Sequence, residues 1–166
     1  SGSSERNAIE NFESGMVQVE SSACISNVNV DKVFSVFMDP KFQKDAIEEL
    51  QEIRMVGENT CENVKVPMLG RSHYCYKNEI YKDSEGILIH NWVVSNAPLS
   101  EAETPTYYRE VLVSVHQVGP NVAIHINTIG RGVKINSLIK GIVKKIVLNK
   151  QSRVLTLLNQ RSKRPN

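Results

Sequence analysis

The sequence predicts an α+β protein in which an antiparallel sheet of about seven strands packs against one long C-terminal helix. Between Met16 and Gly130 the apolar residues recur mostly at every second position, which is typical of strands. From Val133 to Gln160 they recur at every third or fourth position, which is typical of an amphipathic helix. Two short helical segments follow the first strand, so the sheet is expected to be the main layer.

The chain has the length of one domain and enough residues to bury a sizeable core. Residues 1–14 are polar and are expected to be flexible, and Ser1–Ser4 looks like the cloning scar of a domain taken from a larger protein. We expect residues 15–160 to form the domain and residues 161–166 to form a basic tail. No apolar run reaches the roughly eighteen residues of a transmembrane helix, so none is predicted.

The first strand is expected over Met16–Ser26, where apolar and polar residues alternate. Asn29 or Asp31 can cap a short helix after it. That helix must end before Pro40, because the residue that precedes a proline avoids the helical region. A second short helix is expected over Pro40–Leu50, with the proline in its first turn.

Six further strands are expected after these helices, where the apolar period changes from about four to two. Their ranges are Glu52–Val56, Glu62–Val66, Ser72–Lys82, Ile87–Asn96, Tyr107–Val118 and Asn121–Gly130. Turn residues at Asp83–Gly86 and at Gly119–Pro120 predict that the last four strands form two hairpins. Residues 97–106, which include two prolines, are expected to form a solvated loop between the hairpins.

The C-terminal helix, Val133–Gln160, would span roughly 40 Å, enough to cross a small domain. Its apolar stripe consists of Ile135, Leu138, Ile139, Ile142, Val143, Ile146 and Val147. We expect Leu138, Ile142 and Ile146 to point inward against the sheet, which would leave the lysines facing solvent or a bilayer.

The positive charge of the chain is concentrated at its C-terminal end. No Asp or Glu follows Glu110, although that part of the chain carries ten of the twenty Lys and Arg residues. This asymmetry indicates an anionic partner, either a membrane surface or a nucleic acid. The alternative is that the lysines only supply the solvated face of an amphipathic helix, for which Lys is a good helix former.

The cysteines and histidines do not form a recognisable metal signature. Cys24, Cys61 and Cys75 are odd in number and widely spaced, which favours free thiols in a reducing compartment over a disulfide framework. His73 and Cys75 could share a strand face, but no ligand spacing is completed. We therefore expect neither a metal site nor a cofactor other than a bound ligand.

The order of elements resembles that of the START-like, or helix-grip, superfamily, in which a curved seven-stranded sheet wraps a long C-terminal helix. The resemblance covers Met16–Gln160. Lys65–Arg71, followed by the strand His73–Lys82, is similar to the apolar Pro/Gly loop and following strand of VASt domains. Gly132–Arg153 is similar to the closing helix of that branch, and more loosely to PRELI-type domains.

The resemblance implies that the protein binds one lipid, a sterol or a phospholipid, in an apolar cavity between sheet and helix and transfers it between membranes. We expect a monomer that acts at the cytosolic face of intracellular membranes, such as a membrane contact site, as a domain of a larger membrane-associated protein.

The candidate cavity residues are the apolar or aromatic positions that alternate along the later strands and the C-terminal helix. They are Leu88, His90, Trp92, Val94, Val113, Val115, Ile124, Ile126, Leu138, Ile139, Ile142 and Ile146. Ile87, Ile89 and Val93 offer the alternative face of one strand, because the sequence does not say which face is concave. The same residues would also suit a filled core.

A loop at Pro67–Gly70 is the candidate lid or membrane contact. Exposed apolar side chains at a loop tip, here Met68 and Leu69, often mark a membrane or partner surface. The alternative is that they fold back over the core. Five nearby or helical cations would complement anionic headgroups at about 1 kcal/mol each. They are Lys65, Arg71, Lys140, Lys144 and Lys145.

No catalytic constellation is evident, and we do not expect an enzyme. The alternative function is a small-molecule-binding protein or a cyclase- or hydrolase-type enzyme on the same fold. It would need His90 or His125 in the cavity beside a carboxylate such as Glu79 or Glu110. Nucleic-acid binding by the basic end is disfavoured, because no aromatic residue follows Tyr108 to stack on bases.

Overall fold

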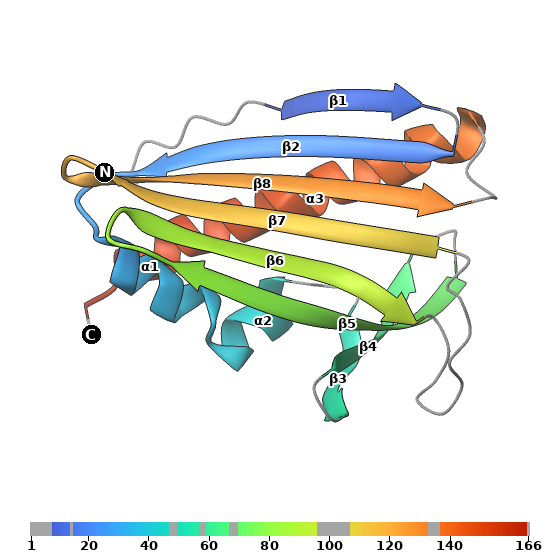
Figure 1. Ribbon diagram of the computed structural model, residues 1–166, viewed down its shortest axis with the longest axis horizontal. Helices are drawn as coiled ribbons and strands as arrows, with labels where there is room; N and C mark the ends of the chain where they lie inside the picture. Colours follow the sequence, from blue (N-terminus) through green and yellow to red (C-terminus); the bar gives the residue numbers. More distant parts are fainter. Residues whose placement is uncertain are drawn as a thin grey trace.

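The computed structural model describes residues 8–13, 15–46, 50–56, 59–66, 70–95, 107–132 and 137–165. These residues form one antiparallel sheet in the order β1-β2-β8-β7-β6-β5-β4-β3, with the helices on one of its faces (Figure 1). The strands are β1 (Ala8–Glu13), β2 (Met16–Ile25), β3 (Leu50–Val56), β4 (Asn59–Val66), β5 (Gly70–Lys82), β6 (Gly86–Ser95), β7 (Tyr107–Val118) and β8 (Asn121–Gly132). The helices are α1 (Val30–Phe37), α2 (Pro40–Ala46) and α3 (Ser137–Ser162).

The predicted α+β class and order of elements are confirmed, and the sheet gains one strand. This strand is β1, which lies in the segment that was expected to be flexible and pairs with β2 from Ala8↔Ser21 to Glu13↔Met16. An edge strand is held by its backbone hydrogen bonds to one neighbour, so a polar sequence without clear alternation can still form it. The prediction of a flexible N-terminal segment is therefore wrong for these six residues.

The strand register assigns each side chain to one of two faces. Directly opposed residues of paired strands point to the same side of the sheet. The inner face, defined here as the face toward α3, consists of Val17, Val19, Ser21, Ala23 and Ile25 of β2, Val122, Ile124, Ile126, Thr128 and Gly130 of β8, Arg109, Val111, Val113, Val115 and Gln117 of β7, and Ile87, Ile89 and Asn91 of β6. The outer face carries the residues between them.

The apolar core lies between one end of the inner face and the helices. Val33 of α1, Phe42 of α2 and Leu155 and Leu158 of α3 are almost fully buried against it. The strand side chains of this core are Ala23, Ile25, Ile87, Ile89, Val113, Val115, Val122, Ile124 and Ile126. Figure 1 shows α1, α2 and the C-terminal end of α3 gathered at this end of the sheet.

A buried glutamine fixes α3 on the sheet. Gln151 Nε2 donates hydrogen bonds to the backbone carbonyl of Val19 and to Thr128 Oγ1, both at 2.9 Å. The Ser21 hydroxyl donates to Gln151 Oε1 at 2.5 Å. Ser21, Thr128 and Gln151 are all buried, and buried polar groups are costly unless they are paired. The network therefore sets both the register and the rotation of α3 over β2 and β8.

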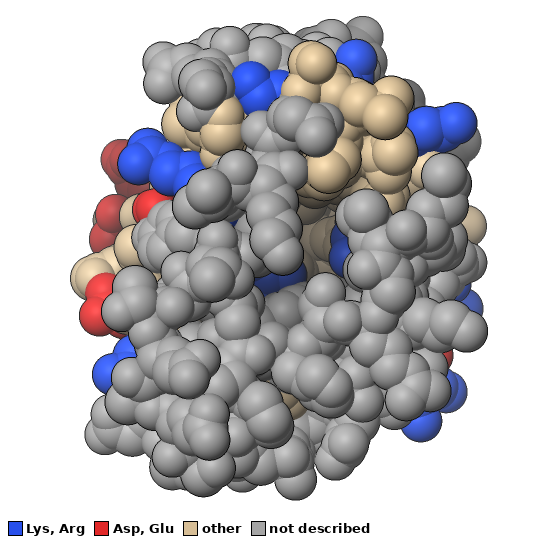
Figure 2. Space-filling model, turned by 90° about the vertical axis from the view of Figure 1, so that its right-hand side faces the viewer, with Lys and Arg blue, Asp and Glu red and all other residues tan. Residues whose placement is uncertain are grey.

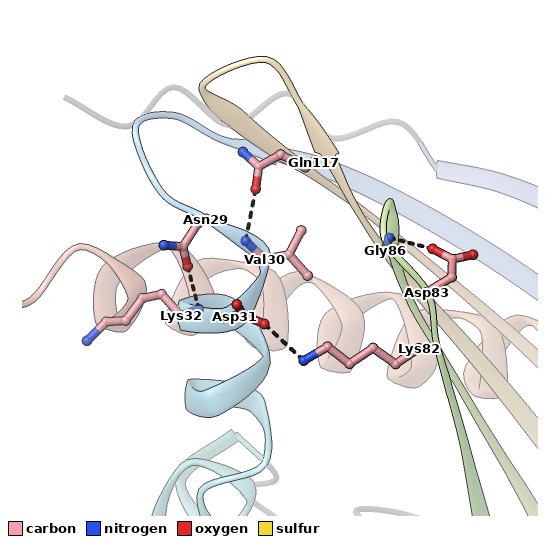
Figure 3. A network of polar contacts seen from close by, with 8 residues as sticks. All are labelled: Asn29, Val30, Asp31, Lys32, Lys82, Asp83, Gly86 and Gln117. Atoms are coloured by element: carbon pink, nitrogen blue, oxygen red, sulfur yellow. Dashed lines mark hydrogen bonds and ion pairs between the residues drawn. The ribbon is translucent and has the colours of Figure 1, made fainter.

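A polar network joins α1 to the neighbouring strand ends (Figure 3). Asn29 Oδ1 accepts a hydrogen bond at 2.8 Å from a backbone N–H in the first turn of α1, which confirms Asn29 as the N-cap. Gln117 Oε1 accepts one from the Val30 backbone N–H at 3.0 Å, and Lys82 forms an ion pair with Asp31 at 3.0 Å. These contacts fix where α1 begins relative to β5 and β7.

The predicted turn between β5 and β6 is confirmed. Asp83 Oδ1 accepts a backbone hydrogen bond from Glu85 at 2.8 Å. It accepts a second one from Gly86 at 2.9 Å (Figure 3). These donors hold the pKa of the Asp83 carboxyl below its ordinary value of 3.8. Gly86 has no room for a side chain, because a Cβ there would collide with the Val115 carbonyl oxygen of β7.

The predicted ends of α2 and α3 shift by a few residues. The described part of α2 ends at Ala46, and Leu50 already belongs to β3. α3 continues to Ser162, which is buried, so the expected basic tail from residue 161 begins too early. Arg161 pairs with Asp45 of α2 and holds the pKa of that carboxyl below its ordinary value. The first four residues predicted for the helix, 133–136, lie outside the described residues.

The cysteines differ from the prediction of free thiols. Cys61 of β4 and Cys75 of β5 lie directly opposite each other in the register and form a disulfide, and both are buried. Cys24 is free and half-buried. Spacing along the chain could not reveal this pair, because the hairpin register brings residues 14 apart into contact.

Candidate functional site

Four predicted cavity residues on β7 and β8 belong to the filled core. Val113, Val115, Ile124 and Ile126 point to the inner face, and none is more than 4% exposed. They pack among the buried side chains of α1, α2 and the C-terminal half of α3. Of the two alternatives open from the sequence, a filled core and a cavity wall, the structure supports the filled core for these four.

The predicted cavity residues on β6 lie mostly on the wrong face. Leu88, His90 and Trp92 pair with Ser114, Leu112 and Glu110 and point to the outer face, away from α3. Leu88 is 37% exposed. The alternative set, Ile87 and Ile89, occupies the inner face and is buried. Val94 lies at a register irregularity between β5 and β6 and is half-buried, so the pairing does not fix its direction.

Two histidine–carboxylate pairs form on the outer face. His90 Nε2 lies 2.9 Å from Glu110 Oε1, and its ring lies 4.8 Å from that of Trp92 between centroids. His125 Nε2 lies 3.6 Å from Glu20 Oε1. A general acid/base site was expected to need such a pair inside the cavity. Both pairs lie on the side of the sheet opposite to α3, so this geometry does not assemble a catalytic site beneath the helix.

The two halves of α3 differ in burial. The C-terminal half carries the buried residues Gln151, Leu155, Leu158 and Ser162. From Ser137 to Lys150 no side chain is buried, and Leu138 is 76% exposed. The predicted cavity residues Ile139, Ile142 and Ile146 are half-buried. The apolar N-terminal half of α3 is thus not packed into the core, although it belongs to the same continuous helix.

The helical phase brings two lysines to the inner side of α3. Positions seven and eleven residues apart lie on the same face of a helix. Lys144 and Lys140 precede Gln151 by these spacings and are half-buried, whereas Lys145 is exposed. The sequence stripe of isoleucines had placed the lysines outward. The buried stripe Gln151, Leu155, Leu158 and Ser162, with two polar members, is the signal that would have given the correct phase.

Polar groups line the inner face below this part of α3. Arg109 of β7 pairs with Gly130, in the inner row, and its Nη2 donates a hydrogen bond to Asn91 Oδ1 at 3.2 Å. Its Cζ lies 5.6 Å from the ring centroid of Tyr76, which is 6% exposed. Cations over an aromatic face are attracted by the ring quadrupole. Sequence reasoning missed Arg109, because the candidate cavity residues were chosen among apolar and aromatic positions.

Figure 2 shows the end of the molecule where α3 begins. The surface is hollowed there, and Lys or Arg atoms lie recessed within the hollow. A separate, shallow hollow of about 400 Å³ lies along the outer side of α3. Its lining residues are Asn149, Ser152, Arg153, Thr156, Leu157 and Gln160, so it shares no residue with the predicted cavity.

The predicted lid can be assessed only in part. Pro67, Met68 and Leu69 lie outside the described residues, and Gly70 is the first residue of β5, paired with Val66. Lys65 and Arg71 are opposed across β4 and β5. Among the described residues, no helix is long and apolar enough to cross a membrane.

Solved structures share this fold. Human STARD10 has 10% sequence identity with a TM-score of 0.66, over 95% of this chain and 72% of its own. A START superfamily protein from Mycobacterium smegmatis has 10% identity and a TM-score of 0.64, over 88% of this chain and 97% of its own. A STAR-related lipid transfer protein from Xanthomonas axonopodis has 11% identity and a TM-score of 0.63, over 96% and 99%.

These likenesses show that the chain has the START-like helix-grip fold, as the order of its elements predicted. No protein-family model matches the chain, and no curated protein matches it. The likeness therefore concerns the fold, and it does not select the VASt or the PRELI branch.

Proposed function

We propose that the protein binds a lipid between the inner face of the sheet and the N-terminal half of α3, and transfers it between membranes. One observation carries the proposal: this half of α3 is rich in Ile, Val and Leu, yet none of its side chains is buried. Leaving this apolar surface partly exposed is unfavourable in water by about 25 cal/mol per Å². A lipid chain is the natural partner for such a surface.

The fold supports the same function. The Xanthomonas axonopodis neighbour is named a STAR-related lipid transfer protein, and a human StAR-related lipid transfer protein shares the fold at a TM-score of 0.64 and 6% identity. The firm attachment of the C-terminal half of α3 through Gln151 would let the other half move aside while the core stays intact. Lipid entry by such a local opening requires no unfolding of the sheet.

The finer parts of the proposal concern where the protein acts. The exposed Lys145 and the lysine-rich α3 suit contact with an anionic membrane surface. We propose peripheral action at intracellular membranes, with the protein as a monomeric binding domain and not an enzyme. The proposed ligand is a sterol or a phospholipid.

A liposome assay tests the proposal. Donor vesicles carrying a fluorescent sterol or a fluorescent phospholipid are mixed with unlabelled acceptors, and transfer is followed by dequenching. We expect the protein to accelerate transfer of at least one lipid, and more strongly when the acceptors contain anionic lipid. Leu138→Asp, at an exposed position in the first turn of α3, should slow transfer without unfolding the protein. No acceleration for any lipid would refute the proposed function.

A further inference from the structure

The burial of the inner face changes at one level of β6 and β7. Ile89 of β6 and Val113 of β7 lie directly opposite each other, and each is 4% exposed. The next pair on the inner face, Asn91 and Val111, also lies directly opposed, and both residues are half-buried. The packed part of the inner face on these two strands therefore ends between the two pairs.

The burial of α3 changes at the same level. Gln151 is buried and donates a hydrogen bond to Thr128, which lies directly opposite Val111 on the neighbouring strand. On the C-terminal side of Gln151, α3 packs into the apolar core. On its N-terminal side, from Ser137 to Lys150, none of its side chains is buried. Three elements, α3, β6 and β7, thus leave the core together.

Bonded polar groups mark this level beneath α3. Gln151 bonds to Ser21 and to Thr128, and all three side chains are buried. A hydrocarbon chain that passed this level beneath α3 would have to separate these partners, which is costly for polar groups that water cannot reach. Beyond them it would meet side chains that already fill the core, such as Leu155 at 1% exposed. Both effects oppose a longer chain at the same place.

Two contacts fix the direction of α3 along β2. Gln151 Nε2 donates a hydrogen bond to the Val19 carbonyl at 2.9 Å, near the start of the strand. Lys163 Nζ donates one to Ser26 Oγ at 3.3 Å, just after the end of the strand. α3 therefore runs along β2 in the same direction. Val17 is buried as well, so the half-buried part of the inner face lies beside α3, over β7 and β6.

The N-terminal half of α3 reaches beyond the start of β2 (Figure 1). From Ser137 to Gln151 the helix extends for about 20 Å. From Met16 to Val19 the strand extends for only about 10 Å. The hydrocarbon of one membrane leaflet is about 15 Å thick, half that of the bilayer. A lipid chain of ordinary length thus fits between the hollowed end of the molecule, where α3 begins, and Gln151 (Figure 2).

We infer that the level of Gln151 is the closed inner end of the lipid site, and that it limits the length of the apolar chain that the protein accepts. This inference rests on the proposed function and adds a selectivity to it: lipids whose chains exceed about 20 Å are bound less well. The size of the side chain at position 151 contributes to the limit. Val111, half-buried and directly opposite Thr128, lies at the same level on the open side and contributes as well.

The test compares lipids that differ only in chain length. Saturated phosphatidylcholines and phosphatidylserines, from didecanoyl to ditetracosanoyl, are offered in equal amounts as minor components of fluid vesicles, and cholesterol is offered separately. Bound lipid is measured by native mass spectrometry. A methylene inside the site replaces one inside the bilayer, so occupancy should be nearly level up to the limit. Each methylene that finds no place in the site should then lower occupancy about fourfold.

Variants at the inner end should move the limit in opposite directions. Gln151→Ala makes room for longer chains, so the first excluded lipid should gain about fourfold or more relative to the shortest one. Val111→Phe fills the inner end and should move the limit to shorter chains. Gln151→Leu loses the same hydrogen bonds as Gln151→Ala but keeps most of the volume, so it should move the limit less. Gln160→Ala, at an exposed position on the same helix, should leave the limit unchanged. Circular dichroism melting confirms that each variant is folded.

The outcomes separate the two proposals. Level occupancy over the whole series refutes the length limit while lipid binding stands, and so does a limit that folded Gln151→Ala or Val111→Phe leaves in place. Binding of cholesterol alone has the same meaning. If neither the phospholipids nor cholesterol bind, both the limit and the proposed function are refuted. Opposite shifts of the limit in the two variants support both.

Discussion

Gln151 provides the sharpest test of how α3 is held on the sheet. Its side chain makes three hydrogen bonds, with Ser21, Thr128 and the Val19 carbonyl. The side chains of Gln151, Ser21 and Thr128 are all buried. In Gln151→Leu these partners lose their bonds, at about 1–3 kcal/mol for each buried group left unsatisfied. The two hydroxyls can turn to nearby backbone carbonyls, which recovers part of that loss. We expect a net destabilisation of about 2–4 kcal/mol.

The measurement is urea unfolding followed by circular dichroism, with two comparison variants. Gln160→Leu, an exposed position on the same helix, should change the free energy of unfolding by no more than about 0.5 kcal/mol. The triple variant Gln151→Leu, Ser21→Ala, Thr128→Val removes all three side-chain polar groups together. It should recover most of the lost stability, because no hydroxyl is then left unsatisfied. A Gln151→Leu protein as stable as the wild type would refute the assigned role of this network.

Three further predictions concern the sheet. Reduction of the disulfide, or the double change Cys61→Ala and Cys75→Ala, should lower the free energy of unfolding by about 3 kcal/mol, as for a short closed loop. Non-reducing peptide mapping should recover the two linked peptides. Recovery of only free thiols would contradict the disulfide. Gly86→Ala should lower the melting temperature measured by circular dichroism, because its Cβ would collide with the Val115 carbonyl, and an unchanged value would show that the β6–β7 contact is looser than described. The pKa of Asp83 is lowered in the folded state, so its contribution to stability is complete above pH 3.8. That contribution is lost as the pH falls through the pKa of the folded state. The stability difference between wild type and Asp83→Asn should therefore shrink in acid, and a difference that grows there would contradict the assignment.

The disulfide also bears on where the protein acts. Disulfides persist in oxidising compartments and are rare in the cytosol. The expectation of a cytosolic location was supported from the sequence by three widely spaced cysteines, and the pairing of Cys61 with Cys75 removes that support. Peptide mapping of protein taken directly from its own cells, with thiols blocked at lysis, would show which state occurs there.

Local patterns were sufficient to predict most of the fold. Asn29 marks the start of α1, Asp83 and Gly86 mark the β5–β6 turn, and the alternation in β7 and β8 gives two strands within two residues of their observed ends. Each of these signals acts between residues that are close in sequence. β1 was missed because its pairing with β2, and not its own composition, makes it a strand.

The candidate site was harder to predict because it depends on which face of each strand points toward α3 and on the rotation of α3 about its axis. A strand exposes two faces, and the choice between Leu88 and Ile87 required the register with β7. For α3 the isoleucine stripe suggested one rotation, whereas Gln151 with its partners on β2 and β8 imposes another. From the sequence alone, a glutamine is expected to be exposed to solvent. Its role appears only when Ser21 and Thr128 are brought beneath it.

Native mass spectrometry of the intact protein tests lipid binding most directly. The purified protein is stripped of bound lipid, incubated with vesicles made from a mixture of sterols, neutral phospholipids and anionic phospholipids, and separated from them before measurement. We predict a complex of one lipid with one chain, released on collisional activation and identified by its mass. Protein that remains bare after exposure to the whole mixture would contradict the account.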